Sequence, residues 1–123
     1  MTYPAGSEQA QDARTPGSVE VIGSAARVRL VLAGEVDASM NAQMVEAVND
    51  VADRGVPIDV DTRNVTFIDS SVIALLVYLA SRVAQPIRFI QPSEPVRFLM
   101  DITQLDEQVD VLDHDPGPDE AQG

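Results

Sequence analysis

The order of strand-like and helix-like segments is the feature that most constrains how this chain can fold. The segments "VEVIG" and "RVRLVLAG", residues 19–23 and 27–34, nearly alternate in polarity, and "GSAA" between them supplies a turn. This pattern predicts a β-hairpin. Helix-like and strand-like segments then alternate along the chain. Because strands joined through helices pair by right-handed crossovers, the order predicts an α/β sandwich with a mixed sheet of four to five strands.

Three segments after the hairpin have helical patterns. Across residues 41–54 the apolar side chains recur every three or four positions, and Asp37 or Ser39 can cap the start. A second helix is predicted over about residues 71–84, and a third lies in "SEPVRFLMDI", with Ser93 as its cap. Short strands are predicted between and after these helices, at "PIDVDT", "PIRFIQ" and "QVDVL".

The formal charge of −12 is distributed unevenly. Residues 106–123 hold seven acidic residues and no arginine, whereas residues 21–105 hold ten acidic residues and seven arginines. The body of the chain is therefore close to neutral, and the acidity belongs mainly to the tail. Phosphate contacts need clustered positive charge, but the chain has eight scattered arginines and no lysine. We therefore expect no direct binding to nucleic acid.

The chain has no cysteine and a single histidine, His114, in the polar tail. Disulfides and thiolate sites are therefore excluded, and we expect no metal or cofactor. The most apolar run, residues 72–80, is about half as long as a membrane span, and no leader-like segment opens the sequence. We expect a cytoplasmic protein without membrane insertion. Composition divides it into a flexible arm (1–18), one domain (19–112) and an acidic disordered tail (113–123).

The triplet "DSS" lies at the predicted junction between a strand and the second helix, after an apolar anchor formed by Phe67 and Ile68. In a structural interpretation, Asp69 or Ser70 caps the helix, because such side chains accept hydrogen bonds from free backbone N–H groups. In a functional interpretation, capping leaves at least one hydroxyl, on Ser70 or Ser71, at the start of the helix. Exposed N–H groups and the helix dipole favour an anion there, so a phosphoserine would be tolerated.

Several enzymatic interpretations lack essential residues. No GxSxG elbow surrounds Ser70, no glycine-rich phosphate loop occurs, and His114 lies outside the predicted domain core. A serine nucleophile therefore has no evident base. A phosphoaspartate receiver is expected to have an acidic pair and a lysine, and this chain has no lysine. We predict a protein that is not an enzyme.

One stripe of the second helix could face a partner. Ala74, Leu75, Tyr78 and Arg82 fall on one side of the helix at helical spacing, and the stripe begins beneath the serines. If this stripe faces solvent, Leu75 and Tyr78 form an apolar and aromatic surface of the kind that partner proteins bind. In the alternative, Leu75 is an ordinary core residue and Tyr78 lies at the rim.

Three segments of the chain form recognisable motifs, "LAGEVDAS" (32–39), "FIDSSVIALL" (67–76) and "VRFLMDITQL" (96–105). Together they resemble the STAS family, in particular the bacterial anti-sigma factor antagonists. The order, spacing and placement of all three agree with the family. The resemblance covers residues 19–112 and implies a STAS-type sandwich with helices packed mainly on one face of the sheet. One residue departs from the family pattern, because Val72 stands where a glycine usually follows the serines.

The resemblance implies a switch based on phosphorylation. In such proteins a partner that is both an anti-sigma factor and an ATP-dependent kinase phosphorylates the first serine, here Ser70, with Ser71 as the alternative. The unphosphorylated form binds this kinase and frees the sigma factor, and a metal-dependent Ser/Thr phosphatase resets the switch. The β-branched side chain of Val72 could hinder this phosphorylation or alter partner choice. The partner-binding residues expected from the motifs and the helix stripe are Asp37, Ser39, Asp69, Ser71, Leu75, Tyr78 and Arg82.

Two other functions remain compatible with the sequence. Some short members of the family are accessory subunits that stabilise a transporter ATPase without a phosphorylation cycle. A nucleotide-binding or signal-sensing module would instead use a pocket between the sheet and its helices, although no phosphate-binding motif supports it.

Overall fold

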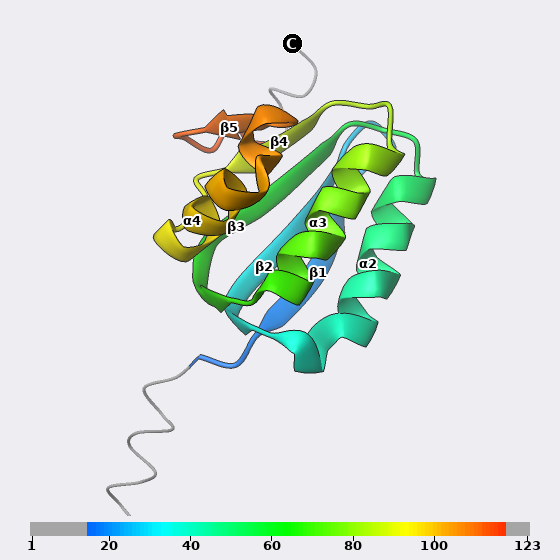
Figure 1. Cartoon of the computed structure of the whole chain (residues 1–123). Coiled ribbons are helices and arrows are strands. Elements are labelled where there is room, and N and C mark those ends of the chain that lie inside the picture. The colour runs from blue at the N-terminus through cyan, green and yellow to red at the C-terminus, as the bar shows by residue number, and fades with distance from the viewer. Residues whose placement is uncertain (1–14, 118–123) are drawn as a thin grey trace, which may run out of the picture.

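The computed structural model describes residues 15–117. Within them the chain forms a five-stranded sheet and three α-helices (Figure 1). In chain order the elements are β1 (Ser18–Gly23), β2 (Val28–Val36), α2 (Asn41–Asp53), β3 (Ile58–Ile68), α3 (Ser70–Arg82), β4 (Ile87–Ile90), α4 (Glu94–Thr103) and β5 (Asp110–Leu112). Two short 3₁₀ turns, η1 (Ala38–Met40) and η2 (Leu105–Glu107), precede α2 and β5.

The strands lie in the sheet in their sequence order. Only β1 is antiparallel to its neighbour, and β2, β3, β4 and β5 run parallel. A parallel neighbour requires a crossover, and helices α2, α3 and α4 supply these crossovers on one face of the sheet (Figure 1). The predicted fold class, an α/β sandwich with a mixed sheet covered mainly on one side, is confirmed.

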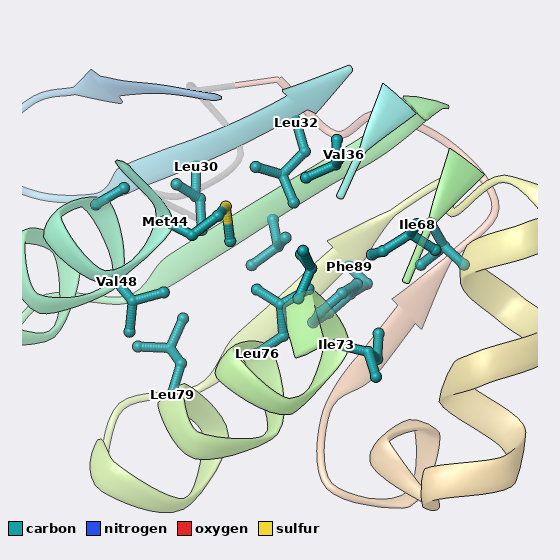
Figure 2. Close-up of a cluster of buried hydrophobic side chains, with 14 of the residues drawn as sticks. Leu30, Leu32, Val36, Met44, Val48, Ile68, Ile73, Leu76, Leu79 and Phe89 are labelled. Atoms are coloured by element: carbon teal, nitrogen blue, oxygen red, sulfur yellow. The ribbon is translucent and has the colours of Figure 1, made fainter. Parts of the chain in front are cut away.

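The core lies between this helical layer and the sheet (Figure 2). Strand β2 alternates between buried and half-buried residues along its whole length, as a strand with one face on the core does. Apolar side chains of α2 and α3 cover the buried face, and each fully buried one contributes about 1.5–3 kcal/mol. The residues labelled in Figure 2 are Leu30, Leu32, Val36, Met44, Val48, Ile68, Ile73, Leu76, Leu79 and Phe89.

Two predicted helix caps differ from the structure. Asp37 caps the 3₁₀ turn η1 rather than α2, and α2 begins after Met40, which makes no side-chain capping bond. The extra turn arises because Asp37 accepts from the backbone N–H of Ser39, only two residues on. Ser93 occupies the predicted position before α4, but its hydroxyl is buried and makes no hydrogen bond among the described residues.

Strand β3 is longer than predicted and includes both residues of the expected apolar anchor. The strand spans 11 residues, Ile58–Ile68, whereas "PIDVDT" ends at Thr62. Consecutive strand residues face opposite sides of a sheet. Ile68 is therefore buried, but Phe67 remains 47% exposed, so the anchor assignment of Phe67 is wrong.

At each end of the domain predicted over residues 19–112, described residues outside its boundaries contact the sheet. Near the N terminus, the Glu35 N–H donates to the Thr15 carbonyl at 2.9 Å, and Pro16 forms a parallel bridge with Glu35. Near the C terminus, Asp115 pairs with two arginines of the sheet, and Pro116 is buried. The flexibility predicted for residues 1–14 and the disorder predicted for 118–123 lie outside the described residues. No helix in the described part is long and apolar enough to cross a bilayer.

Candidate functional site

Asp69 lies between β3 and α3 and caps the helix with one carboxylate oxygen. Its Oδ1 accepts from the backbone N–H groups of Ser71 at 3.0 Å and Val72 at 3.2 Å. Its own backbone is extended, as an N-cap residue requires. Between the two capping candidates left by the sequence, Asp69 and Ser70, the structure therefore selects Asp69. Ser70 is the first residue of α3.

The other carboxylate oxygen joins the helix start to a second loop. Oδ2 of Asp69 accepts from the Ala38 N–H at 2.9 Å, and the Asp69 N–H donates to the Val36 carbonyl at 3.3 Å. The two loops meet because β2 and β3 are parallel and end in register, with Val36 opposite Ile68. The carboxyl ends of parallel strands lie at one edge of a sheet, which is where α/β proteins commonly place their sites.

The segment from the loop after β2 to the start of α2 contributes three more polar side chains. Asp37 accepts from the Ser39 N–H at 3.0 Å and from its hydroxyl at 2.5 Å. Asn41, at the start of α2, has its Oδ1 3.4 Å from the Ser71 hydroxyl. The sequence motifs did not mark Asn41 as a site residue, although its position two residues after Ser39 is a signal that could have included it. The residues joined at this edge, named here the junction cluster, are Asp37, Ser39, Asn41, Asp69, Ser70 and Ser71.

The two serines of the cluster have different environments. The Ser71 hydroxyl is half-buried and donates to Asp69 Oδ1 at 2.6 Å. Ser70 is exposed, and its hydroxyl makes no hydrogen bond within residues 15–117. A phosphate on Ser70 would meet the positive end of the helix dipole. Modification of Ser71 would break the bond to Asp69, so the geometry favours Ser70 as the accessible hydroxyl.

Hydrogen bonds keep the Asp69 carboxylate ionised. The Ser71 hydroxyl lowers the pKa of Asp69, and the N–H groups of Val72, Ala38 and Ser71 add to this effect. Partial burial acts in the opposite direction but is outweighed. Asp69 therefore remains an acceptor and a negative charge throughout the neutral range, directly beside Ser70.

The α3 stripe predicted as a partner surface divides into two parts. Leu75 is half-buried and packs against the core, which agrees with its alternative interpretation as a core residue. Tyr78 is 46% exposed, and the Arg82 guanidinium lies 6.0 Å from the centre of its ring. Arg82 also donates to Asn49 at 2.9 Å and to Asp53 at 3.1 Å, which ties α3 to α2.

The exposed part of this stripe is well separated from the junction cluster. At a rise of 1.5 Å per residue, Tyr78 lies about 12 Å and Arg82 about 18 Å along the axis from Ser70. An exposed aromatic closer to Ser70 in sequence is Phe67, near the end of β3. The sequence did not indicate that Phe67 is a surface residue, because an apolar strand residue next to a core position resembles a core residue until the register is known.

Val72 does not project toward a partner. Its side chain is fully buried, at 0% exposure, and it belongs to the core cluster. Only its backbone N–H takes part in the junction, through the bond to Asp69. The β-branched side chain at this position therefore fills the core rather than the surface around Ser70. No group of three or more His, Asp or Glu side chains suited to a metal ion occurs in the described part of the chain.

Fold and site together define a STAS-type α/β domain, in which an Asp-capped helix begins beside the loop after β2. A family-wide sequence profile described as "Mlab, STAS domain" matches residues 20–113. The chain belongs to this family. No curated protein sequence matches it.

Solved structures with the same fold include anti-sigma factor antagonists. One from Mycobacterium paratuberculosis has a TM-score of 0.72 at 16% identity, covering 87% of this chain and 92% of that one. Unphosphorylated SpoIIAA has a TM-score of 0.64 at 20% identity, covering 87% and 94%. The phosphorylated form of the Bacillus cell fate determinant SpoIIAA has a TM-score of 0.57 at 19% identity, covering 87% and 96%. At these identities the likeness establishes the fold.

Proposed function

We propose that this protein is an anti-sigma factor antagonist, switched by phosphorylation of Ser70. The unphosphorylated chain binds an anti-sigma factor kinase in the cytoplasm and releases a sigma factor. Phosphorylation ends this binding, and a metal-dependent Ser/Thr phosphatase restores it. The observation that carries the proposal is the exposed Ser70 hydroxyl at the start of α3, beside the Asp69 cap. This hydroxyl makes no hydrogen bond to any residue that the structure describes. The antagonists among the structural relatives, one of them solved in a phosphorylated form, support it.

Electrostatics explains how one phosphate could act as the switch. Phosphorylation adds about −1.5 to −2 charges. A like charge about 6 Å away across a near-surface interface then costs roughly 3 kcal/mol at an effective dielectric constant of about 20. The helix dipole returns about 0.3–1 kcal/mol, but it does so in the free and the bound protein alike. The phosphate should therefore weaken partner binding while the fold is retained.

The proposed partner surface combines the junction cluster with exposed residues of α3. Asp37 and Ser39 form its rim on the β2–α2 side. Asp69 orients Ser71 and caps the helix that begins at Ser70. Tyr78 supplies an aromatic contact farther along α3, with Arg82 beside it. Leu75, which packs on the core, is expected to support this surface from below rather than to contact the partner directly.

Incubation with a cognate anti-sigma factor kinase and ATP tests the proposal. Mass spectrometry should find one phosphate, on Ser70, and Ser70→Ala should prevent it. Ser70→Asp should weaken kinase binding at least about tenfold, since about 1.4 kcal/mol of repulsion is sufficient. Gln108→Glu is a matched control that adds one charge at an exposed position outside the junction cluster, and it should bind normally. Phosphate on Ser71 alone, or equal binding by Ser70→Ala and Ser70→Asp, would contradict the proposal.

A second candidate is an accessory subunit of a transporter ATPase that has no phosphorylation cycle. The family description "Mlab, STAS domain" names no sigma-factor role and leaves this function open. Copurification with a transport ATPase, together with indifference of that complex to Ser70→Asp, would favour the accessory role over the antagonist.

A further inference from the structure

Four of the eight arginines gather on the face of the sheet that the helices leave uncovered. Arg27 and Arg29 flank the buried Val28 at the start of β2, so their side chains point away from the core. Asp59 is opposite Arg29 and Arg88 in the registers of the two neighbouring strand pairs. We name the group Arg27, Arg29, Arg63 and Arg88 the arginine face.

Two carboxylates of the sheet closely bind three of these four guanidinium groups. Asp59 is 1% exposed and accepts from Arg27 at 2.5 Å and from Arg88 at 2.8 and 3.0 Å. Asp61 accepts from Arg63 at 3.1 and 3.0 Å. Arg29 comes no closer than 3.5 Å to an oxygen of either carboxylate, a distance at the upper limit for a hydrogen bond. The sheet therefore leaves Arg29 with poor anionic partners.

Asp115 supplies the missing carboxylate from the C-terminal segment. Its Oδ1 accepts from Arg29 Nη2 at 2.9 Å, and its Oδ2 accepts from Arg29 Nη1 at 3.1 Å and also from Arg63. This is the forked arrangement in which arginine binds carboxylates most strongly. Arg29 and Arg63 hold the pKa of Asp115 well below its usual range. The arginine face therefore contains a preformed site that binds a carboxylate, named here the carboxylate site. Asp115, which is 86 positions from Arg29 in sequence, occupies it.

The segment around Asp115 contacts the sheet through a few residues, in the manner of a short bound peptide. The Gly117 N–H donates to Asp115 Oδ1 at 2.8 Å, which shapes a tight turn, and Pro116 is buried. The Asp115 side chain remains 31% exposed, and that of Arg63 is 32% exposed. A contact of this kind is water-accessible and weakened by salt, so the segment can dissociate while the sheet stays folded.

A cavity adjoins the carboxylate site at the start of β2. It has a volume of about 330 Å³, and Arg29 and Asp59 contribute to its wall. The 51% exposed side chain of Ile22 also lines it and gives it an apolar portion. At its edge, the Nε of Arg27 is buried without a hydrogen-bond partner among the described residues. The surface beside the carboxylate site can therefore receive an apolar side chain.

We propose that the arginine face and this cavity form a docking surface for an acidic peptide segment of a partner protein, and that the chain's own residues 113–117 occupy it in cis. The ligand is an extended segment with an aspartate or glutamate beside an apolar residue. This surface lies at the start of β2, whereas Ser70 follows the end of β3, so the proposal is independent of the phosphorylation switch. A partner segment binds only when the cis segment is displaced.

Fluorescence anisotropy with a labelled peptide of residues 109–117, "VDVLDHDPG", tests this proposal on the full-length chain at low salt. Asp115→Asn weakens the cis competitor and should bind the peptide at least about tenfold more tightly than the unmodified chain. Arg29→Gln combined with Asp115→Asn should abolish the gain, and Arg63→Gln should do the same if Arg29→Gln impairs folding. A peptide with asparagine at the position of Asp115 should not bind.

Asp106→Asn is the matched control, because it removes the same charge from an exposed position at the 3₁₀ turn η2. It should leave peptide affinity unchanged. The proposal is overturned if Asp115→Asn and the unmodified chain bind the peptide equally, or if neither binds it. It is also overturned if binding survives in both arginine variants, because the peptide would then lie elsewhere on the protein.

Discussion

Asp69 serves two elements with its two carboxylate oxygens. One oxygen caps α3, and the other binds the loop that leads into α2. The sequence predicted a cap at Asp69 or Ser70, because both residue types at a strand-to-helix junction are a local signal for a helix start. The bond to Ala38 could not be predicted from local pattern, since it depends on two parallel strands ending in register.

Replacing Asp69 by alanine should therefore cost more than the loss of an ordinary cap. We expect the free energy of unfolding to fall by about 1–3 kcal/mol, the range for a lost N-cap together with a charge-assisted bond. Asp69→Asn retains a good capping side chain and should cost less. Urea denaturation at pH 7 measures both, and equal losses for the two variants would contradict the double role.

The same residue should give a distinct pH dependence. The pKa of Asp69 is lowered in the folded chain from its ordinary value of 3.8. Its charge therefore stabilises the fold above the unfolded pKa, and this contribution is lost as the pH falls through the lowered folded value. The stability difference between the unmodified chain and Asp69→Asn should be constant from pH 7 to about 5 and should shrink below 4. A difference that grows toward acid would exclude this linkage.

At the scale of elements, the sequence predicted the position of α3 well but did not show which way each side chain of its first turn faces. The start and the approximate length of α3 followed from a strong helical pattern. Val72 was harder to place, because a residue in the first turn can face the core or a partner depending on how the helix is rotated on the sheet. The structure buries it completely.

The length of β3 was underestimated because its polar second half, "RNVT", has no apolar run to mark it as strand.

Val72→Gly, which introduces the residue usual in the family, should destabilise this chain. The change removes a fully buried side chain and places a glycine in a helix, so we expect a loss of about 2–4 kcal/mol. Ala74→Gly is a matched control at an exposed position of the same helix and should cost about 1 kcal/mol. Urea denaturation of both variants compares the two losses. Equal losses would mean that Val72 contributes little to the core.

At the scale of the whole molecule, the two faces of the sheet have different chemistry. Three helices cover one face (Figure 1), which carries the apolar core. The other face carries the arginine face with its acidic partners. Alternation along β2 allowed the first to be predicted, since apolar residues at every second position must share a face. The second was missed because the arginines are scattered along the sequence and meet only through strand register. The same reason concealed the contact of Asp115, whose partners lie far away in sequence.

The contact between Asp115 and the arginine face should contribute measurably to the stability of the whole chain. Asp115→Asn removes a charge that two arginines bind, and we expect a loss of about 1–2 kcal/mol at pH 7 and low salt. Because Asp115 and Arg63 are partly exposed, 0.5 M NaCl should reduce this loss. The pKa of Asp115 is lowered in the folded chain. The stability difference between the unmodified chain and Asp115→Asn should therefore be fully present above the ordinary carboxyl pKa of 3.8 and should disappear in more acidic solution. Thermal denaturation of Asp115→Asn, with Asp106→Asn as the control variant, measures this loss of stability. A loss that does not depend on salt would show that the contact is not held by charge.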